Sequence, residues 1–401
     1  MSAERTNLVV YVADALRTDH VGCYGARFVH TPTIDEFARG GVRFDQAIAT
    51  APWTAPSTAS MITGLYPHRH CYLHWDAGLD PAFPTLFTVA AAYGYETGSF
   101  VFDESYLFKG FADANVAGTS ERLDGAFAWL TERRERPFCL WFHSWATHMP
   151  YDVDPTDRRE WRAAKAEIID GIQSGSAPAL ESLRESYRRA VERQSEVLFA
   201  SFLERLDDLG LRERTAVVLV SDHGESWGER FADKREVQGT YHMHGAALYD
   251  EVVEVPLLLS APGLPEGLVV PSQVSLVDLM PTLAELAGSP LDGLDGRSLL
   301  PLVDGTEKGD RPALIVGTDA GAVSQLAVRV PPWKLIHRLE SGEEEAYRLD
   351  LDPRELASRP GDAPPELRAL LEAELAAVSR ERLSADDEAL VERRLADLGY
   401  L

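Results

Sequence analysis

Two apolar runs that end in an aspartate constrain the fold of this 401-residue chain most strongly. Residues 7–13 read NLVVYVA and precede Asp14, and residues 215–224 read TAVVLVSDHG, which places Asp222 and His223 after a second run. Continuous runs of aliphatic and β-branched residues are typical of strands buried on both faces, as in a parallel sheet. In open α/β sheets, ligands bind at the carboxyl ends of the strands. The sequence therefore predicts acidic side chains at the ligand-binding edge of a parallel sheet.

Segments with strand and helix patterns alternate along most of the chain. Strands are predicted at GSFVF, at residues 137–145 and at 255–263, and helices at 31–44, 84–94, 119–134, 155–210 and 277–288. Such alternation favours an α/β fold with a mostly parallel sheet flanked by helices.

From about residue 312 the pattern changes. The segments ALIVGTD, LAVRVPPWKLIHRL and EEEAYRLDLD are typical of antiparallel strands, and PPELRALLEAELAAVSRERL is typical of a helix. We therefore expect a main α/β domain over residues 1–311 and a small C-terminal α+β subdomain over 312–401, packed on the main one.

Charge and composition exclude several classes of function. A net charge of −25 argues against nucleic-acid binding through a broad basic surface. No apolar run is long enough for a membrane span, and MSAERTN lacks the basic region of a secretory signal. Three scattered cysteines fit neither a disulfide framework nor a zinc cluster. These features predict a soluble, cytoplasmic protein that is not inserted in a membrane; its oligomeric state stays open.

The acidic surface contains few lysines, and two explanations stay open. It fits a salt-rich cytoplasm, in which self-repulsion is screened, and it fits a genome that favours arginine codons. In either case an anionic ligand needs a locally positive site, such as a metal.

The acidic strand ends have a structural and a functional interpretation. Asp14 can cap a following helix, whereas Asp222, His223 and Gly224 in succession make a poor cap and a good set of metal ligands. Carboxylate oxygen and imidazole nitrogen suit Zn or Mn and, less well, Mg or Ca.

The segment APWTAPSTASMITG, residues 51–64, has the pattern of a helix start rich in hydroxyl groups. Thr54 or Ser57 can be an N-cap, with Pro56 in the first turn. Alternatively Thr54 lies where helix N–H groups favour an anion, and a nearby metal lowers the pKa of its hydroxyl enough for nucleophilic attack.

Two histidines are candidates for contacts with a reacting anion. His148, in WATHMPYD, follows a predicted buried strand, and His244, in TYHMHGAALYDE, precedes another. An isolated histidine is more often an ordinary polar residue. Imidazoles at this edge of the sheet can also donate hydrogen bonds to an oxyanion and protonate a leaving group.

Taken in order, these segments resemble the sulfatase family of the alkaline phosphatase superfamily. The resemblance spans nearly the whole chain, from NLVVYVADALRTDHVGCYG through TAPSTASMITGLYPHRH, THMPY and VSDHGES to HGAALYDEVVEVPLLL. It implies a large α/β sheet with a small C-terminal sheet subdomain. It also implies a divalent metal on Asp14, Asp222 and His223, a nucleophile at Thr54 that also binds the metal, and contacts from His148 and His244 to the transferred group.

The sequence departs from the family pattern in three places. Thr54 stands where sulfatases have the Cys or Ser that becomes formylglycine, and Thr58 replaces the Arg that helps to hold that group. Threonine cannot form formylglycine, because oxidation of a secondary alcohol gives a ketone. Ala15 replaces the second of two adjacent aspartates, so one ligand is lost, and His223 replaces an Asn. The nitrogen ligand shifts the expected metal from Ca toward Mn or Zn.

Together these departures resemble the phosphoryl-transferring, Thr-using members of the superfamily. We therefore expect a hydrolase of small anionic phosphate esters, mainly diesters, with a covalent phospho-Thr54 intermediate and one divalent metal. A sulfate ester hydrolase without formylglycine and a phospho-headgroup transferase stay as alternatives. Only His143 and His242 are spare histidines for a second metal. The natural substrate stays open.

Overall fold

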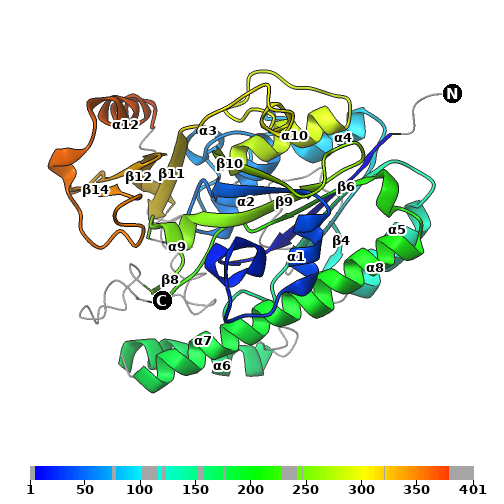
Figure 1. Cartoon of the computed structure of the whole chain (residues 1–401), viewed down its shortest axis with the longest axis horizontal. Coiled ribbons are helices and arrows are strands. Elements are labelled where there is room, and N and C mark those ends of the chain that lie inside the picture. The colour runs from blue at the N-terminus through cyan, green and yellow to red at the C-terminus, as the bar shows by residue number, and fades with distance from the viewer. Residues whose placement is uncertain are drawn as a thin grey trace.

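The computed structural model describes residues 5–74, 78–101, 116–119, 123–151, 158–174, 177–227, 242–245, 247–319 and 321–378. Its centre is an eight-stranded sheet in the order β10-β2-β9-β6-β1-β5-β3-β4 (Figure 1). The bounds are β1 Asn7–Ala13, β2 Val42–Ile48, β3 Glu96–Val101, β4 Val116–Thr119, β5 Phe138–Ser144, β6 Thr215–Val220, β9 Glu254–Ser260 and β10 Leu268–Ser275. Strand β9 is antiparallel to both neighbours, and the other pairs are parallel. The predicted α/β fold with a mostly parallel sheet is confirmed.

Helices cover both faces of this sheet (Figure 1). Alternate residues of β1 point to opposite faces, as the strand geometry requires. Leu8, Val10 and Val12 belong to a core under α2 (Thr54–Thr63), α4 (Leu86–Ala92) and α10 (Leu279–Leu286). Val9, Tyr11 and Ala13 belong to a core under α1 (Pro32–Arg39), α5 (Leu123–Arg133), α7 (Ala177–Arg193) and α8 (Ala200–Asp208). The continuous apolar run of β1 is therefore the result of burial on both faces.

The predicted helices are present, but the first one is shorter than expected. Helix α1 ends at Arg39 with Gly40 as its C-cap, which fits the expectation that Gly40 and Gly41 end the helix; residues 42–44, included in the predicted helical segment 31–44, belong to β2. The correction has a physical reason: Gly40 ends the helix, and the following residues are extended with buried positions at Val42 and Phe44, which suits a strand between β9 and β10. Strands β4 and β10 were also not predicted, and Thr119, the first residue of the predicted helix 119–134, belongs to β4.

The remaining elements are short or lie outside these two layers. They are α3 (Pro67–His70), α6 (Arg158–Ser174), the π-helical turn η3 (Gln194–Phe199), α9 (Asp250–Val253), α11 (Leu300–Val303), the strand pair β7 (Ser226–Trp227) and β8 (His242–Met243), and the 3-10 turns η1 (Thr18–His20), η2 (Gly22–Tyr24), η4 (Arg212–Arg214), η5 (Leu276–Asp278) and η6 (Pro360–Asp362). None of the helices in the described ranges is long and apolar enough to cross a bilayer.

A second sheet of four antiparallel strands follows (Figure 1, upper left). Its strands are β11 (Ala313–Asp319), β12 (Ala322–Val330), β13 (Trp333–Arg338) and β14 (Glu344–Arg348), and α12 (Pro365–Ala377) packs on it through Leu367 and Leu371. The predicted antiparallel subdomain sheet is confirmed. The boundary between residues 311 and 312 stays a prediction, and residues 379–401 lie outside the described residues.

An ion-pair cluster joins this second sheet to α9 and the start of β9. The Nζ of Lys334, which is fully buried, lies 2.8 Å from Asp250 Oδ1 and 2.9 Å from Glu355 Oε1. Arg329 Nη2 lies 3.0 Å from both Asp250 Oδ2 and Glu254 Oε2. Burial opposes the ionisation of Asp250, but Lys334 and Arg329 lower its pKa overall.

Candidate active site

At the carboxyl ends of three strands, a side chain of a type that can bind a metal lies on the same face of the large sheet. Each side chain lies two residues beyond a core residue packed under α2, so strand alternation sends it to the α2 face. The pairs are Val12 and Asp14, Trp141 and His143, and Val220 and Asp222. The start of α2, where Thr54 lies, therefore faces the ends of β1, β5 and β6.

We call Asp14, His143 and Asp222 the metal cluster, because a ligand atom of each lies within 4.8 Å of the others. His143 Nε2 is 3.0 Å from Asp14 Oδ2 and 3.8 Å from Asp222 Oδ2, and all three side chains are fully buried. Asp14 Oδ1 and Asp222 Oδ2 accept no hydrogen bond from the described residues. Burial, and then the charge of Asp222, raise the pKa of Asp14. Two adjacent buried carboxylates with unsatisfied oxygens fit a divalent cation.

His223 presents a nitrogen to the same carboxylates. Its Nε2 lies 3.5 Å from Asp14 Oδ1 and 3.5 Å from Asp222 Oδ2. Its Nδ1 lies 2.8 Å from the carbonyl oxygen of Gly224, to which only a protonated Nδ1 can donate. In the neutral ring Nε2 then carries a lone pair and no proton, which is the tautomer that a metal ligand needs.

His143 is the cluster member that the sequence did not place there; it appeared only as a spare histidine for a second metal. The structure puts it beside Asp14, with Nε2 3.0 Å from Asp14 Oδ2. Ala15 itself has a left-handed backbone (φ 56°), and its amide lies 3.4 Å from Asp222 Oδ1. The available signal was its place two residues after Trp141 on a buried strand.

Thr54 is the first residue of α2, and the N-cap is Trp53, which makes no side-chain cap. The capping alternative for Thr54 or Ser57 is therefore wrong. Thr54 Oγ1 lies 3.1 Å from His223 Nε2, and the side chain is almost fully buried. Ser57 Oγ donates to the Asp222 carbonyl at 2.6 Å, and Thr58 Oγ1, also buried, has no hydrogen bond within the described ranges. Of these three hydroxyls, Thr54 is the one that lies against the histidine of the site.

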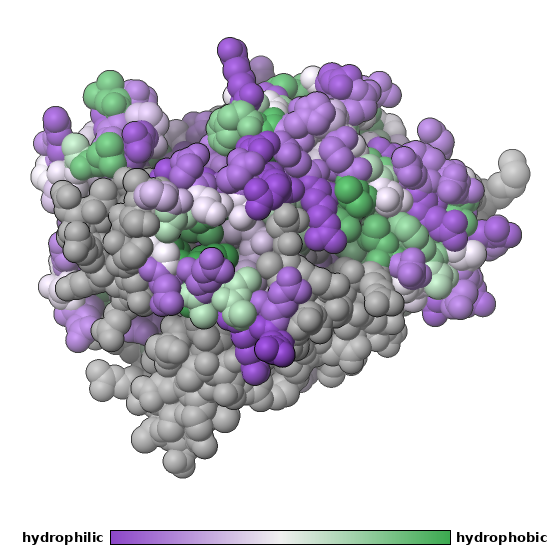
Figure 2. Space-filling view, turned by 90° about the horizontal axis from the view of Figure 1, so that it is seen from below, coloured by the Kyte–Doolittle hydropathy of each residue, from purple (hydrophilic) through white to green (hydrophobic). Residues whose placement is uncertain are grey.

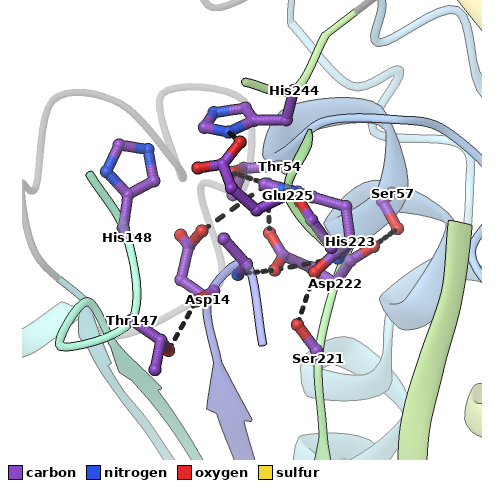
Figure 3. A network of polar contacts seen from close by, with 12 residues as sticks. Asp14, Thr54, Ser57, Thr147, His148, Ser221, Asp222, His223, Glu225 and His244 are labelled. Carbon is purple, nitrogen blue, oxygen red and sulfur yellow. Dashed lines mark hydrogen bonds and ion pairs between the residues drawn. The ribbon is translucent and has the colours of Figure 1, made fainter. Parts of the chain in front are cut away.

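The rings of His148 and His244 come from separate segments and lie on the same side of Asp14 (Figure 3). Their centroids are 5.0 Å apart, and the His244 ring is 4.4 Å from that of His223. The structure thus brings together every residue that the sequence predicted for the site.

The pKa values of the two histidines shift in opposite directions. His148 Nδ1 lies 2.6 Å from the Met149 carbonyl, and burial, then the charge of His244, hold the pKa of His148 well below its usual value. Burial also opposes the charge on His244, but the Glu225 carboxylate outweighs it and raises the pKa of His244. The surroundings therefore shift the pKa values of the two histidines in opposite directions.

Glu225 and Lys165 are charged residues near the site that sequence reasoning missed. Glu225 is fully buried, with Oε1 3.2 Å from His244 Nδ1 and Oε2 2.8 Å from the Tyr151 hydroxyl. Lys165 on α6 is almost fully buried; burial lowers its pKa to about 7, and Glu225 opposes that shift. The Asp-His-Gly-Glu sequence was the available signal for Glu225, whereas nothing in the helical pattern of residues 155–210 marked Lys165.

The described surface also contains a cleft of about 770 Å³ between the two sheets. Its lining includes Arg17, Asp250 and Arg329 but none of the predicted site residues. Arg17 connects it to the site, because its Nη1 donates to the Glu225 carbonyl at 2.9 Å. Figure 2 shows one face of the molecule, where hydrophilic residues surround a hollow with hydrophobic residues at its base.

Comparison with known proteins identifies the family. The family model described as Sulfatase matches residues 6–289. The chain belongs to the sulfatase family. Among curated members, arylsulfatase K of Rattus norvegicus is 26% identical over 434 residues, which cover 89% of this chain and 75% of the relative. The low-salt glycan biosynthesis sulfotransferase Agl7 of Haloferax volcanii is 28% identical over 298 residues, which cover 73% of this chain and 64% of the relative.

Solved structures agree with this sulfatase fold. A 2-O GAG sulfatase superposes with a TM-score of 0.73 at 20% identity, covering 99% of this chain and 94% of its own. The phosphonate monoester hydrolase of Agrobacterium radiobacter superposes with a TM-score of 0.72 at 20% identity, covering 93% of this chain and 95% of its own. The prediction of a sulfatase-family ester hydrolase is confirmed.

Proposed function

We propose that this sulfatase-family protein is a metal-dependent hydrolase of phosphate esters, mainly diesters, and that Thr54 is its nucleophile. The observation that carries the proposal is the position of the Thr54 hydroxyl. It lies at the N-terminal end of α2 and 3.1 Å from His223 Nε2, next to carboxylate oxygens that accept no hydrogen bond from the described residues. A helix N-terminus favours an anion, so the phosphate of a substrate is stabilised beside the attacking oxygen.

Asp14, Asp222, His223 and His143 would hold the metal, with the Thr54 hydroxyl beside it. The unsatisfied oxygens of Asp14 and Asp222 fit this role. When bound, the metal lowers the pKa of the hydroxyl and offsets the negative charge of the substrate. Two imidazoles in the ligand set favour Mn or Zn over Mg and Ca.

The reaction is a double displacement at phosphorus. The Thr54 hydroxyl loses its proton to water, and Oγ1 forms a bond to phosphorus as the bond to the leaving alcohol oxygen breaks. His244 supplies a proton to the departing oxygen, and His148 contacts the equatorial oxygens. With a diester substrate the phosphorus bound to Thr54 still carries the second alcohol. A water molecule then attacks this phosphorus, the bond to Thr54 Oγ1 breaks, and a phosphate monoester leaves as the hydroxyl is restored.

The charge of the site favours a phosphodiester over a phosphate monoester. Position 58, where sulfatases have an Arg, is a buried Thr, and position 244 is a His and not a Lys. With fewer fixed positive charges, the site suits a substrate with one negative charge on the transferred group. A phosphodiester and a sulfate monoester both meet that condition.

Sulfate ester hydrolysis is the second candidate, because the curated relatives include arylsulfatase K and choline-sulfatase. The Haloferax volcanii relative is named a sulfotransferase, so transfer of the group to an alcohol is a third outcome to be tested. The cytoplasmic location stays a prediction that fractionation of the native host would test.

Steady-state kinetics on three esters separate these functions. We expect the Mn- or Zn-loaded protein to hydrolyse bis(4-nitrophenyl) phosphate with a kcat/KM at least about 10²-fold above that for 4-nitrophenyl sulfate, with 4-nitrophenyl phosphate in between. Preference for the sulfate by a similar factor would overturn the phosphate assignment. Product analysis in the presence of glycerol shows whether water or an alcohol is the acceptor.

A further inference from the structure

The turn that follows β1 begins with Asp14 and bends sharply at the next residue, Ala15. Ala15 is fully buried and has a left-handed backbone, with φ 56°. A residue with a side chain adopts this conformation at a cost, and it persists only where the surrounding structure enforces it. Contacts from other elements therefore have to hold this turn in its shape.

A tyrosine hydroxyl from helix α7 supplies two of these contacts. Tyr187 Oη donates to the Ala15 carbonyl at 2.7 Å and accepts from the Arg17 amide at 2.8 Å. A phenolic hydroxyl can donate one hydrogen bond and accept another at the same time. This single group therefore spans the turn from Ala15 to Arg17 and binds the backbone at both ends.

The tyrosine ring is itself fixed by three aromatic neighbours. Tyr187 is fully buried, and its ring centroid lies 5.0 Å from His20, 5.0 Å from Tyr151 and 4.8 Å from Trp227, edge-on in each case. Close packing of this kind restricts the ring to one orientation. The hydroxyl is therefore held against the turn by the core of the protein.

The shape of the turn in turn connects the two carboxylates of the metal cluster. The left-handed residue directs the Ala15 amide toward Asp222 Oδ1, at 3.4 Å. The next amide, that of Leu16, donates to Ser221 Oγ at 2.8 Å. Both contacts join the end of β1 to the end of its neighbour β6. Since Asp14 lies on one side of this junction and Asp222 on the other, a change in the turn alters the spacing of their oxygens.

We propose that Tyr187 is a positioning residue for the metal cluster, whose hydroxyl holds the turn after β1 so that Asp14 and Asp222 keep the spacing that a divalent cation requires. This inference rests on the metal site of the proposed function. It adds to that site a side chain from α7 that acts through the backbone of the turn. Replacing a residue that supports metal ligands from behind typically weakens metal binding by 10- to 100-fold.

Calorimetric titration of chelator-treated protein with Mn²⁺ or Zn²⁺ tests this role. Tyr187→Phe removes only the hydroxyl, and we expect it to raise the Kd of the metal about tenfold. Tyr24→Phe is the matched control. The Tyr24 hydroxyl also bonds a backbone amide and a carbonyl, those of Leu257 at 2.9 and 3.0 Å, but it does so between β2 and β9. We expect its Kd to change less than about twofold. Equal values of Kd in the two variants would overturn the inference.

Glycine at position 15 shows whether the tyrosine acts through the turn. Glycine adopts the left-handed conformation without a steric penalty, so the turn in Ala15→Gly depends less on Tyr187. We expect Tyr187→Phe to raise Kd less than about threefold when it is added to Ala15→Gly. A tenfold rise in both backgrounds would mean that the tyrosine acts by another route, and would overturn the inference.

Hydrogen exchange on the wild-type protein decides if Tyr187→Phe does not fold. The Arg17 amide, as a donor to the tyrosine, should exchange as slowly as the amides of β1. Exchange at the rate of an exposed amide would show that the hydroxyl does not hold the turn, and would overturn the inference.

Failure of this inference and failure of the proposed function have different signatures. If the wild-type protein binds the metal and loses ester hydrolysis with Thr54→Val, but Tyr187→Phe leaves Kd unchanged, only the role of Tyr187 is wrong. If the wild-type protein binds neither Mn²⁺ nor Zn²⁺, the metal cluster itself is wrong, and the proposed function fails with it.

Discussion

The metal cluster and the ion-pair cluster are both buried groups of charges, yet they are built in opposite ways. In the ion-pair cluster, Lys334 bridges Asp250 and Glu355, so each charge has an opposite partner. In the metal cluster, Asp14 and Asp222 lie side by side with two oxygens that accept no hydrogen bond from the described residues. In the first arrangement the protein itself supplies a basic nitrogen within 3.0 Å of each carboxylate. The second places two carboxylates side by side, and their unsatisfied oxygens fit a divalent cation.

This difference separates a structural role from a functional one. Buried ion pairs that satisfy each other hold elements in place, although their net contribution to stability is small or negative. When no ligand is bound, adjacent unsatisfied carboxylates destabilise the folded protein. They are therefore expected at binding or catalytic sites that use their charge. We therefore expect substitutions in the two clusters to have opposite effects on activity and on stability.

The largest expected effect is on activity, from Thr54→Val, which removes the hydroxyl while keeping the shape of the side chain. Because Thr54 is the proposed nucleophile, its replacement should lower kcat for bis(4-nitrophenyl) phosphate by about 10³- to 10⁶-fold. Thr58→Val is the control, because it removes a buried hydroxyl one turn along the same helix, and we expect it to retain activity within a few fold. Equal losses in both variants would show that the helix, and not the nucleophile, had been disturbed.

The next effect is on stability, from Lys334→Met in the ion-pair cluster. Loss of the cation leaves Asp250 and Glu355 buried without it, so the free energy of unfolding should fall by about 3–5 kcal/mol. Arg348→Met is the comparison, since its pair with Asp350 is exposed and should contribute less than about 1 kcal/mol. Urea unfolding measures both. A change below 1 kcal/mol for Lys334→Met would contradict the structural role of this cluster.

The smallest effect should have the opposite sign, from Asp14→Asn in the metal-free protein. Because the pKa of Asp14 is raised in the folded state, its ionised form destabilises the protein above the unfolded pKa. The variant should therefore gain about 1–3 kcal/mol at pH 7, and the gain should disappear toward pH 4, where the wild-type carboxyl is protonated. Chelator-treated samples unfolded in urea at several pH values test this. Loss of stability at pH 7 would mean that the charge of Asp14 is already compensated.

The fold and most of the site residues were predictable because both depend on local patterns. Apolar runs that end in Asp14 and Asp222 indicate buried parallel strands with their carboxyl ends at one edge. The roles expected for Thr54 and His148 followed from the resemblance to the sulfatase family. The outcome is a site whose predicted members lie together in the structure, although their chemical roles stay proposals.

The missed features depend on contacts between distant segments. Which face of β5 carries His143 becomes clear only once β5 is paired with β1, in the register Val12 opposite His143. Glu225 becomes a candidate site residue only through its contacts with Tyr151 and His244, which lie far from it in the chain. The start of strand β2 was not predicted. Only two glycines separate it from the preceding helix, and nothing else in the sequence marks the change from a helical to a strand pattern.

The most direct test of the metal cluster is the free energy of unfolding of chelator-treated protein as Mn²⁺ or Zn²⁺ is added. A site that binds metal only in the folded state should stabilise the wild-type protein by about 2.7 kcal/mol when the free metal concentration reaches 100 times Kd. We expect the same increment in Arg348→Met and none in Asp222→Asn. An equal increment in Asp222→Asn, or none in the wild-type protein, would contradict the conclusion that this cluster is built for a divalent cation.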